Sequence, residues 1–235
     1  MSLAPSFRIA CGLALVAAGL ATLPVSSGSA TLIHVYDLNG SLADGLGGPA
    51  LLSDGGALGL TSYSFAPNQG LRLAGGLPNP GVYTIELTCQ ISNTAGYRKL
   101  IDYQNLTADD GLYNLNGTLN FYPIANTTIV RILPDQMACI TLTRDASGVL
   151  TGYVDAFQTW SVADPSNLGV VGPAADVLRF FEDDFVTSQV EASAGVVDRI
   201  RIWDGPLTAS EVADACFGAT PTRHRTWGAL KQLYR

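Results

Sequence analysis

A strand that runs directly into a short helix near the end of the chain constrains the fold more than any other stretch. Arg199, Ile200, Arg201 and Ile202 alternate polar and apolar side chains, as in a strand with one buried face. A turn at residues 204–206 follows. Thr208 and Glu211 then stand at the spacing at which a hydroxyl and a carboxylate satisfy the open N–H groups of a helix's first turn. Residues 196–212 therefore predict one buried strand that ends in one short helix.

The first thirty residues have the pattern of a secretory signal. Arg8 precedes an apolar run over residues 9–23, and the small residues Gly28, Ser29 and Ala30 follow. As a helix, this run would span roughly 22 Å, which is short of the roughly 30 Å hydrocarbon core of a bilayer. We predict that residues 1–30 are a signal peptide cleaved after Ala30, and that the protein is secreted or held at the cell surface.

The composition of the remaining chain favours a single β domain. The sequence holds 25 Gly, nine Tyr and eight Phe, and its short apolar runs are separated by clusters of Gly, Asn, Asp and Pro. We predict an all-β fold, an antiparallel β-sandwich with one short helix near the C-terminus, over residues 31–220. The strands are expected at residues 32–38, 70–73, 82–91, 97–103, 111–115, 118–122, 128–133, 137–144 and 149–154, with a tight hairpin at Asn116-Gly117.

Three cysteines remain after the predicted cleavage: Cys89, Cys139 and Cys216. An oxidising compartment permits one disulfide among them, and the sequence does not choose among the three pairings. The alternative is that they are buried thiols, and their spacing offers no metal motif.

Charge divides the chain into an acidic body and a basic end. Residues 31–222 carry a net charge of −12, whereas Arg223, Arg225, Lys231 and Arg235 follow without any acid. An acidic body repels phosphate backbones, so we expect no nucleic-acid partner. The tail at residues 221–235 is a basic amphipathic segment. It could serve export or attachment, contact a membrane or sorting machinery, or dock on its own domain.

Eight segments in register resemble one family. They are residues 83–87, 96–102, 110–113, 116–117, 119–122, the pair 142–145 with 152–155, 179–185 and 197–205. In order and spacing they are similar to LamG-like proteins exported by bacteria, which belong to the concanavalin A-like jelly-roll group. One departure is Ala156, where a glycine usually follows the Tyr-Val-Asp segment, so the tip of that hairpin is expected to differ.

The resemblance implies a recognition module, and two sets of residues are candidates for its site. LamG domains often bind calcium, so Asp109 with Asp110 and Asp183 with Asp184 are the candidate ligands for Ca²⁺. The alternative is that these aspartates serve turns and a solvated loop. A glycan would stack on aromatic side chains, for which Tyr97, Tyr113, Tyr122 and Trp160 are the candidates, although packing is their alternative role.

We therefore expect a non-catalytic exported protein that recognises a glycan or a cell-surface partner, with calcium as its one candidate cofactor. A structural protein of the matrix or envelope is the main alternative. A glycoside hydrolase is a third, because the same sandwich hosts glucanases with paired carboxylates on one strand. Glu182-Asp183-Asp184 is the nearest match, but these residues are expected in a loop and lack the alternating pattern of such enzymes.

Overall fold

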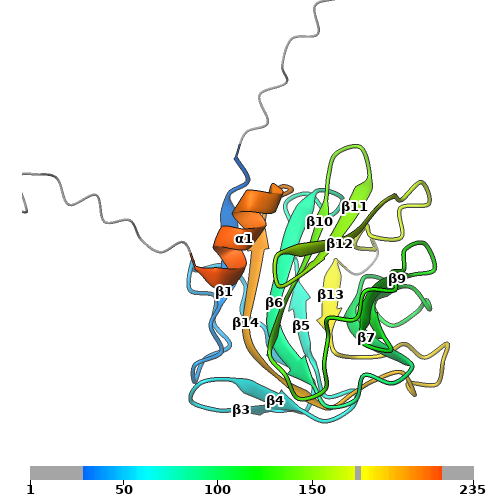
Figure 1. The fold of residues 1–235 in the computed structure, drawn as a ribbon. Helices are drawn as coiled ribbons and strands as arrows, with labels where there is room; N and C mark the ends of the chain where they lie inside the picture. The colour runs from blue at the N-terminus through cyan, green and yellow to red at the C-terminus, as the bar shows by residue number, and fades with distance from the viewer. Residues whose placement is uncertain (1–28, 173–175, 219–235) are drawn as a thin grey trace, which may run out of the picture.

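The protein is a sandwich of two antiparallel sheets with a helix against the outer face of one of them (Figure 1). The computed structural model describes residues 29–172 and 176–218. The expected all-β fold with one short helix near the C-terminus is confirmed. The strands are β1 (Leu32–Tyr36), β2 (Leu52–Ser53), β3 (Ala57–Leu58), β4 (Tyr63–Phe65), β5 (Leu71–Ala74), β6 (Tyr83–Ile91), β7 (Tyr97–Asp102), β8 (Gly111–Leu115), β9 (Thr118–Tyr122), β10 (Ala138–Arg144), β11 (Val149–Val154), β12 (Phe157–Ala163), β13 (Val177–Phe180) and β14 (Gly195–Trp203).

The first sheet has the strand order β12-β11-β10-β6-β14-β4-β3, and β1 also pairs with β14. The second sheet has the order β2-β5-β13-β7-β8-β9. Apolar side chains of both sheets fill the space between them in one large cluster, which includes Leu87, Ile200, Leu112 and Phe180. Burial of this core is the main source of the sandwich's stability.

Helix α1 (Ala209–Phe217) follows β14 as the sequence predicts, and its capping box is present. Thr208 is the N-cap, its hydroxyl accepts from the Glu211 backbone N–H, and the Glu211 side chain accepts from the Thr208 N–H. The helix packs on the outer face of the first sheet, where Val212 and Ala215 join a small apolar cluster with Trp203. The outer face of β6 is consequently buried as well, so Thr84 and Glu86 are inaccessible.

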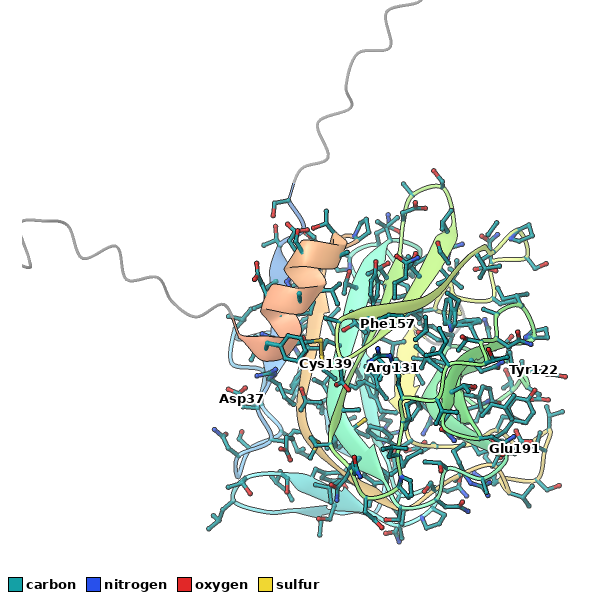
Figure 2. All side chains as sticks on the ribbon, viewed as in Figure 1. Asp37, Tyr122, Arg131, Cys139, Phe157 and Glu191 are labelled. Carbon is teal, nitrogen blue, oxygen red and sulfur yellow. A yellow bond between two sulfur atoms is a disulfide. The ribbon has the colours of Figure 1, made fainter. Side chains whose placement is uncertain are left out.

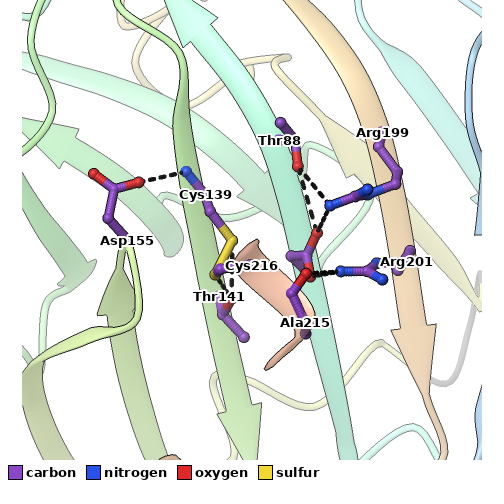
Figure 3. The surroundings of a disulfide bond; sticks show 9 residues. Thr88, Cys139, Thr141, Asp155, Arg199, Arg201, Ala215 and Cys216 are labelled. Atoms are coloured by element: carbon purple, nitrogen blue, oxygen red, sulfur yellow. Dashed lines mark hydrogen bonds and ion pairs between the residues drawn. A yellow bond between two sulfur atoms is a disulfide. The ribbon is translucent and has the colours of Figure 1, made fainter. Parts of the chain in front are cut away.

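A disulfide and a buried carboxylate hold this helix to the sheet (Figure 3). Cys139 of β10 is bonded to Cys216 of α1, and Cys89 is a buried free thiol. Glu86 accepts from Arg199 at 3.2 Å and from Arg201 at 2.5 Å, and Arg201 also donates to the Ala215 carbonyl. The structure thus settles the pairing that the sequence left open.

Some predicted elements differ from the observed ones. Residues 128–133 were expected to form a strand and do not, because only an isolated bridge between Thr118 and Val130 forms there. Strands β2, β3 and β4 were missed, and so was β12. The tip between β11 and β12 is a two-residue turn in which Asp155 and Ala156 both have positive φ, of 50° and 59°.

Among the described residues, no helix is long and apolar enough to cross a bilayer. The predicted signal peptide lies almost wholly outside the described residues, and so does the basic tail from residue 221.

Candidate functional site

A small pocket lies on the second sheet, near the start of β7 and the end of β9. Its volume is about 90 Å³, and Tyr97, Asp109, Tyr122 and Glu191 line it. Tyr122 and Glu191 lie near each other in Figure 2, far from Asp37 on the other side of the domain. We call it the tyrosine pocket. Aromatic side chains combined with a few polar groups are typical of ligand sites.

Three tyrosines pack edge to face at this pocket. The ring centroid of Tyr97 lies 5.5 Å from that of Tyr113 and 5.5 Å from that of Tyr122, and the interplanar angles are 81° and 78° respectively. Tyr113 is wholly buried beneath the other two, whereas Tyr97 and Tyr122 are partly exposed. Such packing is favourable for aromatic rings and fixes their positions, so two tyrosines reach the surface from a rigid base.

A buried lysine lies at the base of the site. The ammonium of Lys99 is 2.5 Å from Asp184 Oδ2, 3.5 Å from Asp102 Oδ2 and 3.9 Å from Asp183 Oδ1, and all four side chains are inaccessible. It also lies 4.8 Å from the ring centroid of Tyr113. Buried charges persist in proteins when they are paired, and here one cation serves several carboxylates. We call Lys99, Asp102, Asp183 and Asp184 the lysine cluster.

The lysine cluster also shapes the loop that carries Glu191. Asp183 Oδ2 accepts from the Thr187 hydroxyl at 2.7 Å and from the Glu191 N–H at 2.8 Å. Asp184 Oδ1 accepts from the N–H groups of Val186 and Thr187. The backbone N–H of Lys99 donates to the backbone carbonyl of Glu191 at 2.8 Å. These bonds fold the loop back across β7 and hold Glu191 at the pocket.

Burial and mutual repulsion shift the pKa values of several carboxyl groups here. The pKa of Asp110 is raised to about 6 by burial and then by Asp102. The pKa of Glu191 is also raised, by burial and then by Asp183, Asp109 and Asp184. Asp184 differs, because hydrogen bonds from Lys99 and Thr187 outweigh its burial and lower its pKa. The site is therefore a concentration of negative charge that one lysine only partly balances.

Tyr113 joins the two acidic pairs that the sequence singled out. Its hydroxyl is 3.0 Å from Asp109 Oδ1 and 3.4 Å from Asp184 Oδ2. The structure therefore brings Asp109, Asp110, Asp183 and Asp184 into one region, from the segment before β8 and the loop after β13. Burial raises the pKa of Tyr113, with Asp109 adding to the effect, so the phenol remains a donor.

The predicted aromatic residues divide into two groups. Tyr97 and Tyr122 line the pocket, and Tyr113 supports them. Trp160 lies elsewhere, in the core, where its Nε1–H donates to the Leu119 carbonyl at 3.0 Å and its ring packs against Phe121. Its edge strand has a mostly exposed pattern, but Trp160 is at an inward position.

Sequence reasoning missed Lys99 and Glu191. Lys99 stands in a strand between aromatic and apolar residues, and a lysine at such a position in an acidic chain is a signal for a buried ion pair. Glu191 had no comparable signal, because its place depends on how the loop folds back on β7.

The four aspartates fit a calcium ion poorly as one set. Calcium takes six to eight oxygen ligands, and an ion among these carboxylates would compete with the ammonium of Lys99, which already contacts Asp184 and Asp183. Within the described part of the chain, the one group of three candidate metal-binding side chains whose ligand atoms lie within 4.8 Å of one another is Glu86, Cys139 and Cys216, and its cysteines form the disulfide. Calcium binding stays a prediction.

The carboxylates considered for glycoside hydrolysis are engaged in other contacts. Glu182 is buried and pairs with Arg179 at 2.7 Å, and burial raises its pKa to about 7. Asp183 and Asp184 belong to the lysine cluster. None of the three lines the tyrosine pocket.

Comparison with known proteins gives similarity of fold. No family model matches the sequence, and no curated protein matches it. Among solved structures, domain 4 of AbnA, a GH43 extracellular arabinanase from Geobacillus stearothermophilus in complex with arabinotriose, has a TM-score of 0.59 and 18% identity over 80% of this chain and 100% of that chain. Trypanosoma rangeli sialidase has a TM-score of 0.58 and 16% identity over 77% of this chain and 32% of its own.

The binding domain of botulinum neurotoxin serotype D is a third similar structure, with a TM-score of 0.56 and 12% identity over 78% of this chain and 51% of that chain. This chain thus spans about a third of the sialidase and half of the neurotoxin domain. At these identities the likeness is one of fold, and the chain shares a β-sandwich with all three structures.

Proposed function

We propose that this protein is an exported LamG-like module that recognises a glycan through the tyrosine pocket, without catalysis. The observation that carries the proposal is the pairing of Tyr97 and Tyr122 with Asp109 and Glu191 around one hollow. Tyrosine rings offer faces and edges for the apolar surface of a sugar, and carboxylates accept hydrogen bonds from its hydroxyl groups.

The comparisons support this proposal. The arabinanase domain, which is matched over 100% of its own length, is described in complex with arabinotriose, and a sialidase that this chain matches over 32% of its length is described in complex with sialic acid. The pocket is also built rigidly, because Tyr113 and the lysine cluster fix its walls before any ligand arrives. Preorganised walls reduce the entropy lost on binding.

Glycan-array binding followed by calorimetry tests the proposal. The exported chain is expected to retain a subset of glycans, and Tyr97→Ala and Tyr122→Ala are each expected to weaken capture by roughly tenfold, as for loss of one aromatic stacking contact. Phe217→Ala is the matched control, because Phe217 is 70% exposed at the end of α1, on the other side of the domain (Figure 1).

Failure of every glycan to bind, or equal losses in all three variants, would contradict glycan recognition at this pocket. The same calorimeter titration with calcium chloride tests calcium binding, and replacement of Asp109 and Asp110 or of Asp183 and Asp184 by Asn identifies the ligands. If chelator leaves the glycan affinity unchanged, glycan recognition stands and the hypothesis that calcium assists it is contradicted.

A further inference from the structure

The tyrosine pocket is acidic on its open side. Asp109 and Glu191 line it, and Asp183 and Asp184 act electrostatically on Glu191 from below. Lys99 is the balancing cation, but it is only 2% exposed and its ammonium contacts Asp184. Among the described residues, the four that line the pocket include no basic one; the nearby Arg98 guanidinium donates to the backbone carbonyls of Tyr97 and Val190. A ligand in the pocket therefore meets tyrosine rings and carboxylates.

Two further buried carboxylates adjoin the lining residues: Asp110 follows Asp109 in the chain, and Asp183 accepts from the Glu191 N–H. Among the described residues, Oδ1 of Asp183 and Oδ1 of Asp110 have no hydrogen-bond partner, and Asp183 is wholly buried while Asp110 is 7% exposed. Buried polar atoms in native structures are nearly always hydrogen-bonded. Asp183 Oδ1 lies 3.9 Å from Lys99 Nζ, within ion-pair distance but beyond hydrogen-bond distance. The region therefore carries more acceptor capacity than its own donors satisfy.

Resting on the proposed glycan recognition, we propose that the pocket selects a glycan with protonated primary amines, such as an oligomer of glucosamine. An ammonium group in the hollow would donate charge-assisted hydrogen bonds to Asp109 and Glu191. The rings of Tyr97 and Tyr122 attract a cation through their negative faces. Sugars that carry a carboxylate are repelled by the same groups, so the site discriminates by charge as well as by shape.

Calorimetry with matched oligosaccharides tests the selection. The full exported chain is titrated with a glucosamine oligomer, with the N-acetylated oligomer of the same length, and with a sialylated oligosaccharide. The glucosamine oligomer is expected to bind at least about tenfold more tightly than its N-acetylated form, and the sialylated one not to bind, because a charge-assisted pair differs from a neutral one by about this factor.

Charge-removing variants assign the effect to the pocket. Glu191→Gln and Asp109→Asn keep the side-chain size, and each is expected to weaken binding of the glucosamine oligomer more than binding of the N-acetylated form, so that the ratio of the two affinities falls about tenfold. Asp37→Asn is the control, because Asp37 is exposed on the opposite side of the domain (Figure 2). Unfolding curves for all three show whether the fold is kept.

The outcomes separate the two levels of the proposal. Equal binding of the amine and N-acetylated oligomers, or preference for the sialylated one, would overturn the charge selection and leave glycan recognition standing. Binding of no oligosaccharide would overturn both. Loss of the amine oligomer when calcium chloride is added at equal ionic strength would show that the metal ion, and not the amine, is the cation that the pocket prefers.

A different observation concerns the predicted cleavage site. The Thr31 backbone nitrogen is 2.6 Å from Asp204 Oδ1, and the Asp204 N–H donates to the Thr31 carbonyl at 3.0 Å. These bonds extend the pairing of β1 with β14 by one residue beyond Leu32 and Trp203. The nitrogen that a cut after Ala30 would release is thus already held against a carboxylate.

We infer that Asp204 is the receptor for the new α-ammonium group of the processed chain. An α-amino group has an ordinary pKa of roughly 8, so it is charged at neutral pH, and a carboxylate beside it raises that pKa. The raised value means that the pair adds stability at low and neutral pH and that this stability is lost as the pH rises through the folded-state pKa. Before processing, Glu211 accepts from the Ser29 hydroxyl at 3.3 Å.

N-terminal sequencing and NMR titration of the α-amino group test this inference. The exported chain is expected to begin at Thr31, and its α-amino pKa is expected to fall when Asp204 is replaced by Asn. In a chain that keeps Ser29 and Ala30, Asp204→Asn should leave the pH dependence of the free energy of unfolding above pH 7 unchanged. A different N-terminus, or an α-amino pKa that Asp204→Asn leaves unchanged, would overturn it.

Discussion

Lys99 is the residue on which the base of the site depends. Its ammonium is the partner of three buried carboxylates, those of Asp102, Asp183 and Asp184. Removal of one member of a buried ion pair leaves an unpaired charge in the low-dielectric interior of the protein. This unpaired charge destabilises the fold far more than the loss of the pair's net attraction does. The lysine is therefore a structural requirement of the loop that presents Glu191.

Replacement of Lys99 by Met tests this role. Lys99→Met is expected to lower the free energy of unfolding by about 3 to 5 kcal/mol, as for other broken buried pairs, and urea denaturation measures it. Arg72→Met is the control, because Arg72 pairs with Asp54 at 3.6 Å and 40% of its side chain is exposed, so it should lose less than about 1 kcal/mol. Similar losses in both would contradict a special role for Lys99.

Asp110 gives the site a measurable pH dependence. Its folded-state pKa is about 6, whereas in the unfolded chain it titrates near its ordinary value of about 4. The folded state then binds more protons between these values, so this group's contribution to stability falls as the pH rises from about 4 to about 6. Asp110→Asn is expected to flatten that part of the stability curve and to stabilise the protein at neutral pH.

Denaturant unfolding at several pH values measures this, with Asp37→Asn as the exposed control. An Asp110→Asn curve that is parallel to that of the native chain between pH 4 and 6 would show that Asp110 is not held in its neutral form.

The turn at Asp155-Ala156 places an alanine in the left-handed region of backbone conformation, which favours glycine. An alanine at φ 59° suffers a steric penalty that glycine does not. Ala156→Gly is therefore expected to stabilise the protein by about 0.5 to 1 kcal/mol, as measured by thermal unfolding. The same substitution at Ala213, in α1, should instead destabilise by about 1 kcal/mol. Destabilisation at both positions would contradict a strained turn.

At the scale of elements, α1 is held on the outer face of the first sheet by three independent features. They are the capping box at Thr208, the apolar cluster around Val212, and the disulfide between Cys139 and Cys216. A helix of nine residues is marginal in isolation, so tertiary contacts decide whether it forms.

Removal of the disulfide tests how much of this depends on the crosslink. Cys139→Ala with Cys216→Ala is expected to lower stability by about 2 to 4 kcal/mol, because the bond closes a loop over a sequence separation of 77 residues. Dithiothreitol should produce a similar loss in the native chain and none in the double variant. The Cys89→Ala variant lacks only the free thiol, so dithiothreitol should destabilise it as much as it destabilises the native chain. A native chain that is insensitive to reduction would contradict the account.

At the scale of the whole molecule, periodicity and turn chemistry predict most of the sandwich. Strands β8 and β9, the Asn116-Gly117 turn and the Thr208 cap are local features, and the sequence places them correctly. Strands β2, β3 and β4, of two or three residues each, carry no period of their own. They form by pairing, β2 with β5, β4 with β14 and β3 with β4. Residues 128–133 have strand composition but find no ladder partner beyond one bridge.

The site was predictable to the extent that its residues carry a local signal. Tyr97 and Tyr122 were candidates as aromatic residues that could stack on a glycan, and the two acidic pairs were candidates as oxygen ligands. Their convergence through Lys99 and Tyr113 depends on the packing of β7, β8 and the loop after β13, which no local pattern encodes. The disulfide pairing is non-local for the same reason.

A crystal structure of the exported chain soaked with a glucosamine oligomer is the direct test of recognition at the tyrosine pocket. We expect sugar density in the hollow between Tyr97 and Tyr122, with an amine nitrogen within hydrogen-bond distance of Asp109 or Glu191. Density on another face, with this pocket filled only by water at saturating ligand, would contradict it.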